Sequence, residues 1–178
     1  DTVYMGSSKY ADLLKSSGLI FQTVELLTRV PDLLIIGEDA NIRPDDLKKL
    51  AAKGVKIFVI GDSAAKNIMM AKLDWSKDFT GLLKVPDWKE FNGLSISDLR
   101  WRSPLNAELI ISLDSFEIEG SGLFAKYEAT NNGLILVSLI DPSRFKTDKY
   151  PYLRFTRWRQ TRAMSQILSN LGAQFSVD

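Results

Sequence analysis

Polar residues that could bind or transform a ligand follow three apolar segments, which end at Gly6, Gly37 and Gly61. The turns there read "GSS", "GEDA" and "GDSA". If the segments are parallel strands, their carboxyl ends share one edge of a sheet, where ligands usually bind. The functional interpretation is a small polar pocket, lined by Ser7, Ser8, Glu38, Asp39, Asp62 and Ser63. The simpler interpretation, which we favour, is that these residues only form turns and cap helices.

The acidic side chains of these turns define an enzymatic alternative. Two carboxylates about 5–10 Å apart can hydrolyse a glycosidic bond, and such a hydrolase would use Asp62 or Glu38. Ser63 lacks the G-x-S-x-G pattern of a nucleophile turn, so we expect it to cap a helix. The 178 residues contain no cysteine and no histidine, which excludes Cys-His, Ser-His and His-metal sites within them. We expect no catalytic residue, metal or cofactor in this chain.

A second cluster lies in "LRFTRWRQTRAMSQILSNLG", residues 153–172, where arginines surround a tryptophan. At about 100° per residue, Arg154, Trp158 and Arg162 share one helix face, where the arginines can stack on the indole ring. This surface could bind single-stranded nucleic acid, stack on a carbohydrate or pack against protein. We favour packing, against another domain or against the chain's own "LRWRSP" segment, because Trp75, Trp88 and Trp101 nearby supply matching aromatic surface.

Arg157 belongs to a different face of the same predicted helix. It falls in the sector of Met164 and Leu168, which predicts that it is largely buried. A buried guanidinium needs a carboxylate or carbonyl partner. We expect a buried structural ion pair with Asp98 or Asp141.

The elements that must position these residues alternate between strand and helix. An α/β fold is therefore predicted, with a doubly wound, mostly parallel sheet flanked by helices, strand order near 2-1-3-4, and later strands beyond the fourth. A C-terminal hairpin extends the sheet, and a closing helix ends the fold. The predicted strands are 2–5, 19–26, 32–37, 55–61 and 107–114, the hairpin is 122–141, and the helices are 7–18, 43–54, one after Ser63, 97–101 and 153–171, with an irregular excursion over 74–105.

Composition limits the partners of the chain. Its 23 basic and 22 acidic residues give a net charge of +1, which argues against a dedicated nucleic-acid binder. No apolar run approaches the roughly 20 residues that a membrane span needs, so we expect neither nucleic acid nor membrane as a partner. We find no repeat and no linker, and we expect one domain over 1–178. The start at Asp1 favours a mature form or a domain excised from a larger protein.

Several segments in this order resemble a known family. "DLLIIG" followed by "RPDDLKKLAAKGVKIFVIG" resembles the core of class I glutamine amidotransferase-like, flavodoxin-like domains. "GLSISDLRWR", "LFAKYEATNNGLILVSLIDP" and "RWRQTRAMSQILSNLG" are similar to the non-catalytic amidotransferase-like domains of bacterial glycoside hydrolases of the family 2 β-galactosidase type. True amidotransferases carry a cysteine nucleophile on the turn that here reads "IGDSAA", and they also need a histidine.

The resemblance implies a function without chemistry of its own. It suggests a structural or interaction domain whose partners are other domains of the same polypeptide and possibly carbohydrate. The location it implies is periplasmic or extracellular. The alternatives are a carbohydrate-binding module that uses Trp158 and its neighbouring arginines, and the hydrolase described above.

Overall fold

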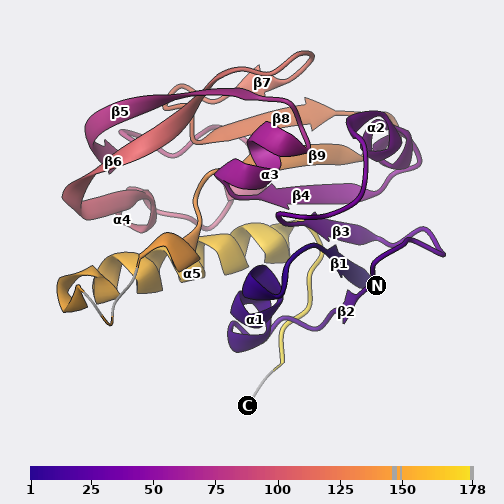
Figure 1. Cartoon of the computed structure of the whole chain (residues 1–178), viewed down its shortest axis with the longest axis horizontal. Helices are drawn as coiled ribbons and strands as arrows, with labels where there is room; N and C mark the ends of the chain where they lie inside the picture. The colour runs from indigo at the N-terminus through magenta and orange to yellow at the C-terminus, as the bar shows by residue number, and fades with distance from the viewer. Residues whose placement is uncertain (146–147, 149, 177–178) are drawn as a thin grey trace.

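A seven-stranded sheet with the order β2-β1-β3-β4-β9-β8-β7 forms the centre of the molecule. The computed structural model describes residues 1–145, 148 and 150–176, with only the backbone described at 102 and 103. Neighbouring strands are parallel from β2 to β9, and β8 and β7 continue the sheet in antiparallel fashion. Figure 1 shows the strands side by side from β2 at the bottom to β7 at the top. Their bounds are β1 Thr2–Met5, β2 Gln22–Thr23, β3 Leu33–Ile36, β4 Lys56–Ile60, β7 Glu117–Ile118, β8 Phe124–Glu128 and β9 Leu134–Ser138.

The predicted doubly wound α/β fold is confirmed, including the strand order 2-1-3-4 and the hairpin that extends the sheet. The α-helices are α1 Ser8–Ser16, α2 Pro44–Ala52, α3 Asp62–Asn67, α4 Ile96–Leu99 and α5 Arg154–Asn170, and the 3-10 helices are η1 Lys89–Phe91, η2 Pro142–Arg144 and η3 Pro151–Leu153. No helix in the described part of the chain combines the length and apolarity needed to cross a membrane.

Helices cover both faces of the sheet, as alternate residues of β8 demonstrate. Lys126 contacts Glu90 of η1, whose backbone oxygen accepts a hydrogen bond from Asn170 at the end of α5. Tyr127, the next residue along the strand, lies under Lys48 of α2. Successive residues of a strand point to opposite faces, so η1 and α5 lie on one face of the sheet and α2 lies on the other.

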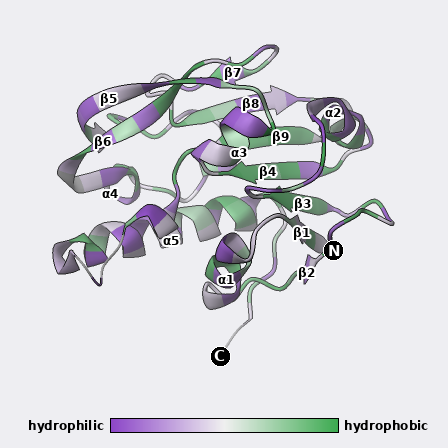
Figure 2. Cartoon of the chain, viewed as in Figure 1, coloured by the Kyte–Doolittle hydropathy of each residue, from purple (hydrophilic) through white to green (hydrophobic). Residues whose placement is uncertain are grey.

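The interior is built from short, continuous apolar strands. Every residue of β3 and β9 is buried, as expected for strands covered on both faces. Figure 2 shows these two strands as mainly hydrophobic, whereas α5 also contains hydrophilic stretches. A smaller cluster of Trp101, Ala107, Phe145 and Leu153 lies beside the main core.

The segment predicted as an irregular excursion contains most of a strand that the sequence pattern does not indicate. Residues Lys72–Gly81 form β5, which pairs antiparallel with the long strand β6, Arg100–Ser112. Most of β5 is exposed or half-buried, with Trp75 64% exposed. The two-stranded β5–β6 sheet shows no alternation of buried and exposed residues along β5, and the pairing register shifts at several points. Hydrophobic periodicity therefore gave no signal for β5.

The C-terminal segment closes the fold against its N-terminal part. Phe175 forms an isolated bridge with Leu19. The Ile20 amide donates to Gln174 over 2.9 Å, and the Ser176 amide donates to Gly18 over 2.8 Å. The segment after α5 is thereby tied to residues 18–20, which follow α1.

Candidate functional site

The residues of the predicted strand-end pocket lie at the carboxyl edge of the parallel strands, but only some of them meet. The Ser7 hydroxyl donates to Glu38 over 3.2 Å, and the Ser7 amide donates to the Glu38 carbonyl. Asp62 and Ser63 are half-buried on the first turn of α3, whereas Ser8 and Asp39 are exposed. Gly61, not Ser63, is the N-cap of α3, so the expected Ser63 cap is wrong. Ser63 instead accepts a hydrogen bond from Asn67 one turn later.

Two buried tyrosines occupy the space beside the strand-end glycines. The Tyr4 hydroxyl donates to the Ser7 carbonyl, and the Tyr10 hydroxyl donates to Asp141, both over 2.7 Å. A Cβ on Gly37 would collide with the Tyr4 hydroxyl, and one on Gly61 would collide with that of Tyr10. The two tyrosine side chains therefore occupy the space beside these turns that a ligand in an open pocket would need.

The electrostatics of this edge keep both tyrosine hydroxyls protonated. Burial raises the pKa of Tyr4 to about 12, and the charges of Glu38 and Asp39 contribute to the increase. Burial and the adjacent Asp141 carboxylate raise the pKa of Tyr10 further, with smaller contributions from Glu38 and Asp62. Among the described residues, no three acidic side chains are grouped so that they could hold a metal ion.

The Tyr10–Asp141 hydrogen bond should contribute measurably to stability. Tyr10→Phe would remove a donor from a carboxylate that is only 6% exposed. We expect a loss of about 1–3 kcal/mol in the free energy of unfolding, measured by urea denaturation. Tyr127→Phe is the matched control, because that hydroxyl makes no hydrogen bond within the described residues. Equal effects of the two substitutions would show that the Asp141 contact contributes nothing.

Arg157 does not form the predicted buried ion pair. It is half-buried and donates to the Phe145 carbonyl over 3.3 Å. Asp141 accepts from Tyr10 and Ser143, and Asp98 accepts from Ser95 in a capping box at the start of α4. Met164 and Leu168, which share its sector, are buried, but Arg157 lies in the first turn of α5, where Arg154, Phe155 and Trp158 are exposed.

Arg154, Trp158 and Arg162 share an exposed face of α5, as their spacing predicted. The Arg162 guanidinium lies 5.3 Å from the centre of the Trp158 ring, which is 56% exposed. More than half of this tryptophan is therefore left uncovered by the rest of the chain. Trp101 from that segment is instead 5% exposed and packs edge-on against Phe79 and Phe145.

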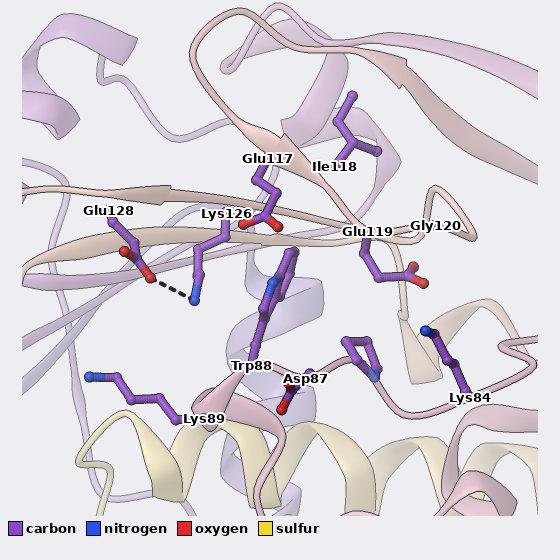
Figure 3. Close-up of a pocket in the computed structure, with 11 residues that line it drawn as sticks. Lys84, Asp87, Trp88, Lys89, Glu117, Ile118, Glu119, Gly120, Lys126 and Glu128 are labelled. Carbon is purple, nitrogen blue, oxygen red and sulfur yellow. Dashed lines mark ion pairs between the residues drawn. The ribbon is translucent and has the colours of Figure 1, made fainter.

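A cavity of about 800 Å³ lies beside β7 and β8, at the antiparallel end of the sheet. Figure 3 shows Trp88 rising between Lys126 and Glu119, with Glu117 above it. The wall comes from the segment before η1, the loop after β7 and the strand β8. Its lining residues are Lys84, Pro86, Asp87, Trp88, Lys89, Glu117, Ile118, Glu119, Gly120, Lys126 and Glu128.

Lys126 forms the charged centre of this wall although its side chain is only 5% exposed. Its ammonium lies 2.9 Å from Glu128, 3.1 Å from the buried Glu90 and 5.0 Å from the centre of the Trp88 ring. Burial works to lower the pKa of Lys126, but the hydrogen bonds to Glu128 and Glu90 outweigh it, and the pKa is raised. The hydrogen bond from Lys126 and the charge of its ammonium lower the pKa of Glu128. Lys126 therefore stays charged.

No pattern in the sequence brings the residues of this cavity together. Trp88 was assigned to a general aromatic surface, and Lys126 was not singled out. One signal was present, because Lys126 lies two residues after Phe124 in an apolar strand and so faces the core. A lysine at such a position requires a buried acid, but its partner Glu90 lies 36 residues earlier in the chain.

Comparison with known proteins places the fold. No protein family and no curated protein sequence matches the chain. A glutamine amidotransferase from Thermotoga maritima has a similar structure, with a TM-score of 0.53, 9% identity and 96% of each chain covered. At this identity the likeness shows the fold alone, and the chain has a glutamine amidotransferase-like α/β fold.

A larger protein contains a region of the same shape. An exo-β-1,4-mannosidase from Opitutaceae bacterium strain TAV5 matches with a TM-score of 0.51 and 12% identity. The match covers 99% of this chain but 36% of the mannosidase, so the chain spans about a third of that protein.

Proposed function

We propose that the chain is a non-catalytic accessory domain of a bacterial glycoside hydrolase that acts outside the cytoplasm. The observation that carries this proposal is the carboxyl edge of the parallel sheet. Tyr4 and Tyr10 fill that edge, and the turn at 60–65 offers Asp62 and Ser63 without any thiol or imidazole in the chain. A fold whose usual ligand edge is closed by its own side chains is suited to a structural role.

The mannosidase comparison supports the second half of the proposal. A region of matching shape there makes up about a third of a much longer chain whose name states a glycosidase activity. By analogy, the chain would accompany a separate hydrolase domain, and that domain would supply the acid and the nucleophile. The finer assignment to a family 2 β-galactosidase type rests on the sequence resemblance.

The exposed face of α5 is the surface that we assign to contact with the rest of the polypeptide. Trp158 and the arginines at 154 and 162 lie together on it, and tryptophan and arginine are enriched in protein interfaces. The stacked Arg162 also holds the indole in place, so less side-chain entropy is lost on docking.

Replacing Trp158 by alanine should therefore act only in the larger protein. In the isolated chain, loss of this exposed ring should change the free energy of unfolding by less than about 0.5 kcal/mol. In the full-length polypeptide it should weaken domain docking by about 2 kcal/mol, as truncation of an interface anchor does, and should speed proteolytic release of the domain. Trp75→Ala on β5 is the matched control, because that ring is also exposed, at 64%.

Two outcomes would contradict the proposed function. One is a complete gene product that ends with this fold and contains no hydrolase domain. The other is turnover of glutamine or aryl-glycosides by the purified chain that Asp62→Asn or Glu38→Gln abolishes, which would establish the enzymatic alternative. If Trp158→Ala changed stability equally in the isolated chain and in the full-length protein, the α5 face would not be the docking surface.

A further inference from the structure

We propose that the cavity beside Trp88 binds a neutral, pyranose-based oligosaccharide. This inference goes beyond the accessory role, because it assigns a ligand to the chain itself and would hold for the domain alone. It also differs from a carbohydrate surface on Trp158, which lies on an exposed helix face and not among the residues that line this cavity.

The Trp88 ring is held in a fixed orientation. It stacks on Phe91 with ring centres 5.7 Å apart and an angle of 26° between the planes, and Phe91 in turn packs edge-on against Phe124 in the core. The Lys126 ammonium lies 5.0 Å from the same indole ring. Trp88 nevertheless remains half-buried and lines the cavity. A preordered, half-buried indole at a cavity wall offers apolar surface on which the C–H groups of a pyranose can pack without further ordering cost.

The polar groups around the ring supply both acceptors and donors. Asp87 and Glu117 are exposed carboxylates, and Lys84 is an exposed amine. Within the described residues these three make no side-chain hydrogen bond or ion pair, so their capacity is available to a ligand. A hydroxyl group both donates and accepts. A polyol can therefore satisfy the carboxylates and the ammonium together.

The charge balance of the wall favours a neutral ligand over an ionic one. Four carboxylates line the cavity, at positions 87, 117, 119 and 128, together with three amines at positions 84, 89 and 126. An anionic ligand would be repelled by the four carboxylates, which outnumber the amines. A cation would meet Lys84 and Lys89, and the deepest charge, Lys126, is already neutralised by Glu90 and Glu128. Glu119 is held by the amide and hydroxyl of Ser121, which braces one side of the opening.

The size of the cavity suits an oligosaccharide of a few units. Its volume of about 800 Å³ lies within the roughly 300–1,000 Å³ typical of small-molecule sites. Residues of the segment before η1 and of the loop after β7 both line this volume (Figure 3).

The test is an NMR titration of the purified 178-residue chain, monitored through its tryptophan indole N–H signals. The probes are β-1,4-mannobiose, cellobiose, spermidine and inorganic phosphate, each up to about 20 mM, which detects dissociation constants in the millimolar range. We expect one or both disaccharides to shift the Trp88 signal in a saturable manner and to leave the Trp158 signal unchanged.

Variants make the result specific to the cavity. Trp88→Ala should weaken binding at least tenfold, Glu117→Gln should weaken it about threefold to tenfold while leaving the core intact, and Trp158→Ala should leave the affinity unchanged. Shifts with spermidine or phosphate but not with the sugars, no shift with any probe, or loss of sugar binding in Trp158→Ala alone would each overturn the proposal. None of these results would bear on domain docking, which the full-length protein tests separately.

Discussion

Replacing Lys126 by alanine should lower the free energy of unfolding by about 3–5 kcal/mol, because the change leaves a buried carboxylate without its counter-ion. Glu90 is 2% exposed, and one of its oxygens already has no hydrogen-bond partner among the described residues, so the Lys126 ammonium is its main source of compensation. Chemical denaturation followed by circular dichroism measures the loss. Lys84→Ala, at an exposed lysine of the same cavity wall, should change stability by less than about 0.5 kcal/mol.

A double substitution separates the cost of a stranded charge from the value of the pair. Lys126→Met combined with Glu90→Leu removes both charges and keeps apolar volume beside Phe91 and Phe124. Buried ion pairs can often be replaced in this way with little loss, so the double variant should regain most of the stability that Lys126→Ala loses. A loss below about 1 kcal/mol for Lys126→Ala would show that water reaches Glu90 and that the pair is not truly buried.

Replacing Gly133 by alanine should destabilise the protein by about 3 kcal/mol or more, because the added methyl group has no room. Gly133 follows the turn of the β8–β9 hairpin, and its Cβ position overlaps the backbone carbonyl of Ala51 at the end of α2. The obstacle is backbone, which cannot rotate away as a side chain can. Relief would require α2 to move away from β9, with loss of packing around Ala51, which is fully buried.

Gly120→Ala is the matched control for this steric effect. Its Cβ position has no atom within 4 Å, so the substitution should leave stability within about 0.5 kcal/mol of the unchanged protein. Thermal melts of the two variants, read against the same reference, give the comparison. A Gly133→Ala variant that melts like Gly120→Ala would show that helix α2 does not contact the hairpin as described.

The parallel part of the fold was predictable because each strand is a continuous apolar run with a turn signal at its end. "DLLIIG" and "VKIFVIG" could hardly be anything other than strands covered on both faces, and Asn131 and Asn132 mark the hairpin turn with positive φ angles. The closing helix was predicted within a residue at each end, and its exposed arginine face was placed by periodicity alone.

The remaining features depend on contacts that a local pattern does not record. Strand β5 is stabilised by pairing with β6 rather than by a buried stripe, so it had no periodic signal. Arg157 was misplaced because helical phase does not record how far along a helix the core extends, and most of the first turn of α5 is exposed. Residues 84–89 and residues 117–128 together line the Trp88 cavity, and no feature of either segment indicates that it contacts the other.

The position of β9 in the sheet has a consequence for synthesis of the chain. This strand pairs with β4 near the middle of the sheet, from Lys56↔Leu134 to Ile60↔Ser138, yet it is made long after β4. At roughly 5–20 residues per second, a ribosome needs roughly 4–15 s to proceed from Ile60 to Leu134. Throughout that interval, an apolar strand edge of the nascent chain has no partner. Unpaired edges of this kind join other chains, so a product released early would be an aggregation-prone half-sheet rather than a smaller version of the domain.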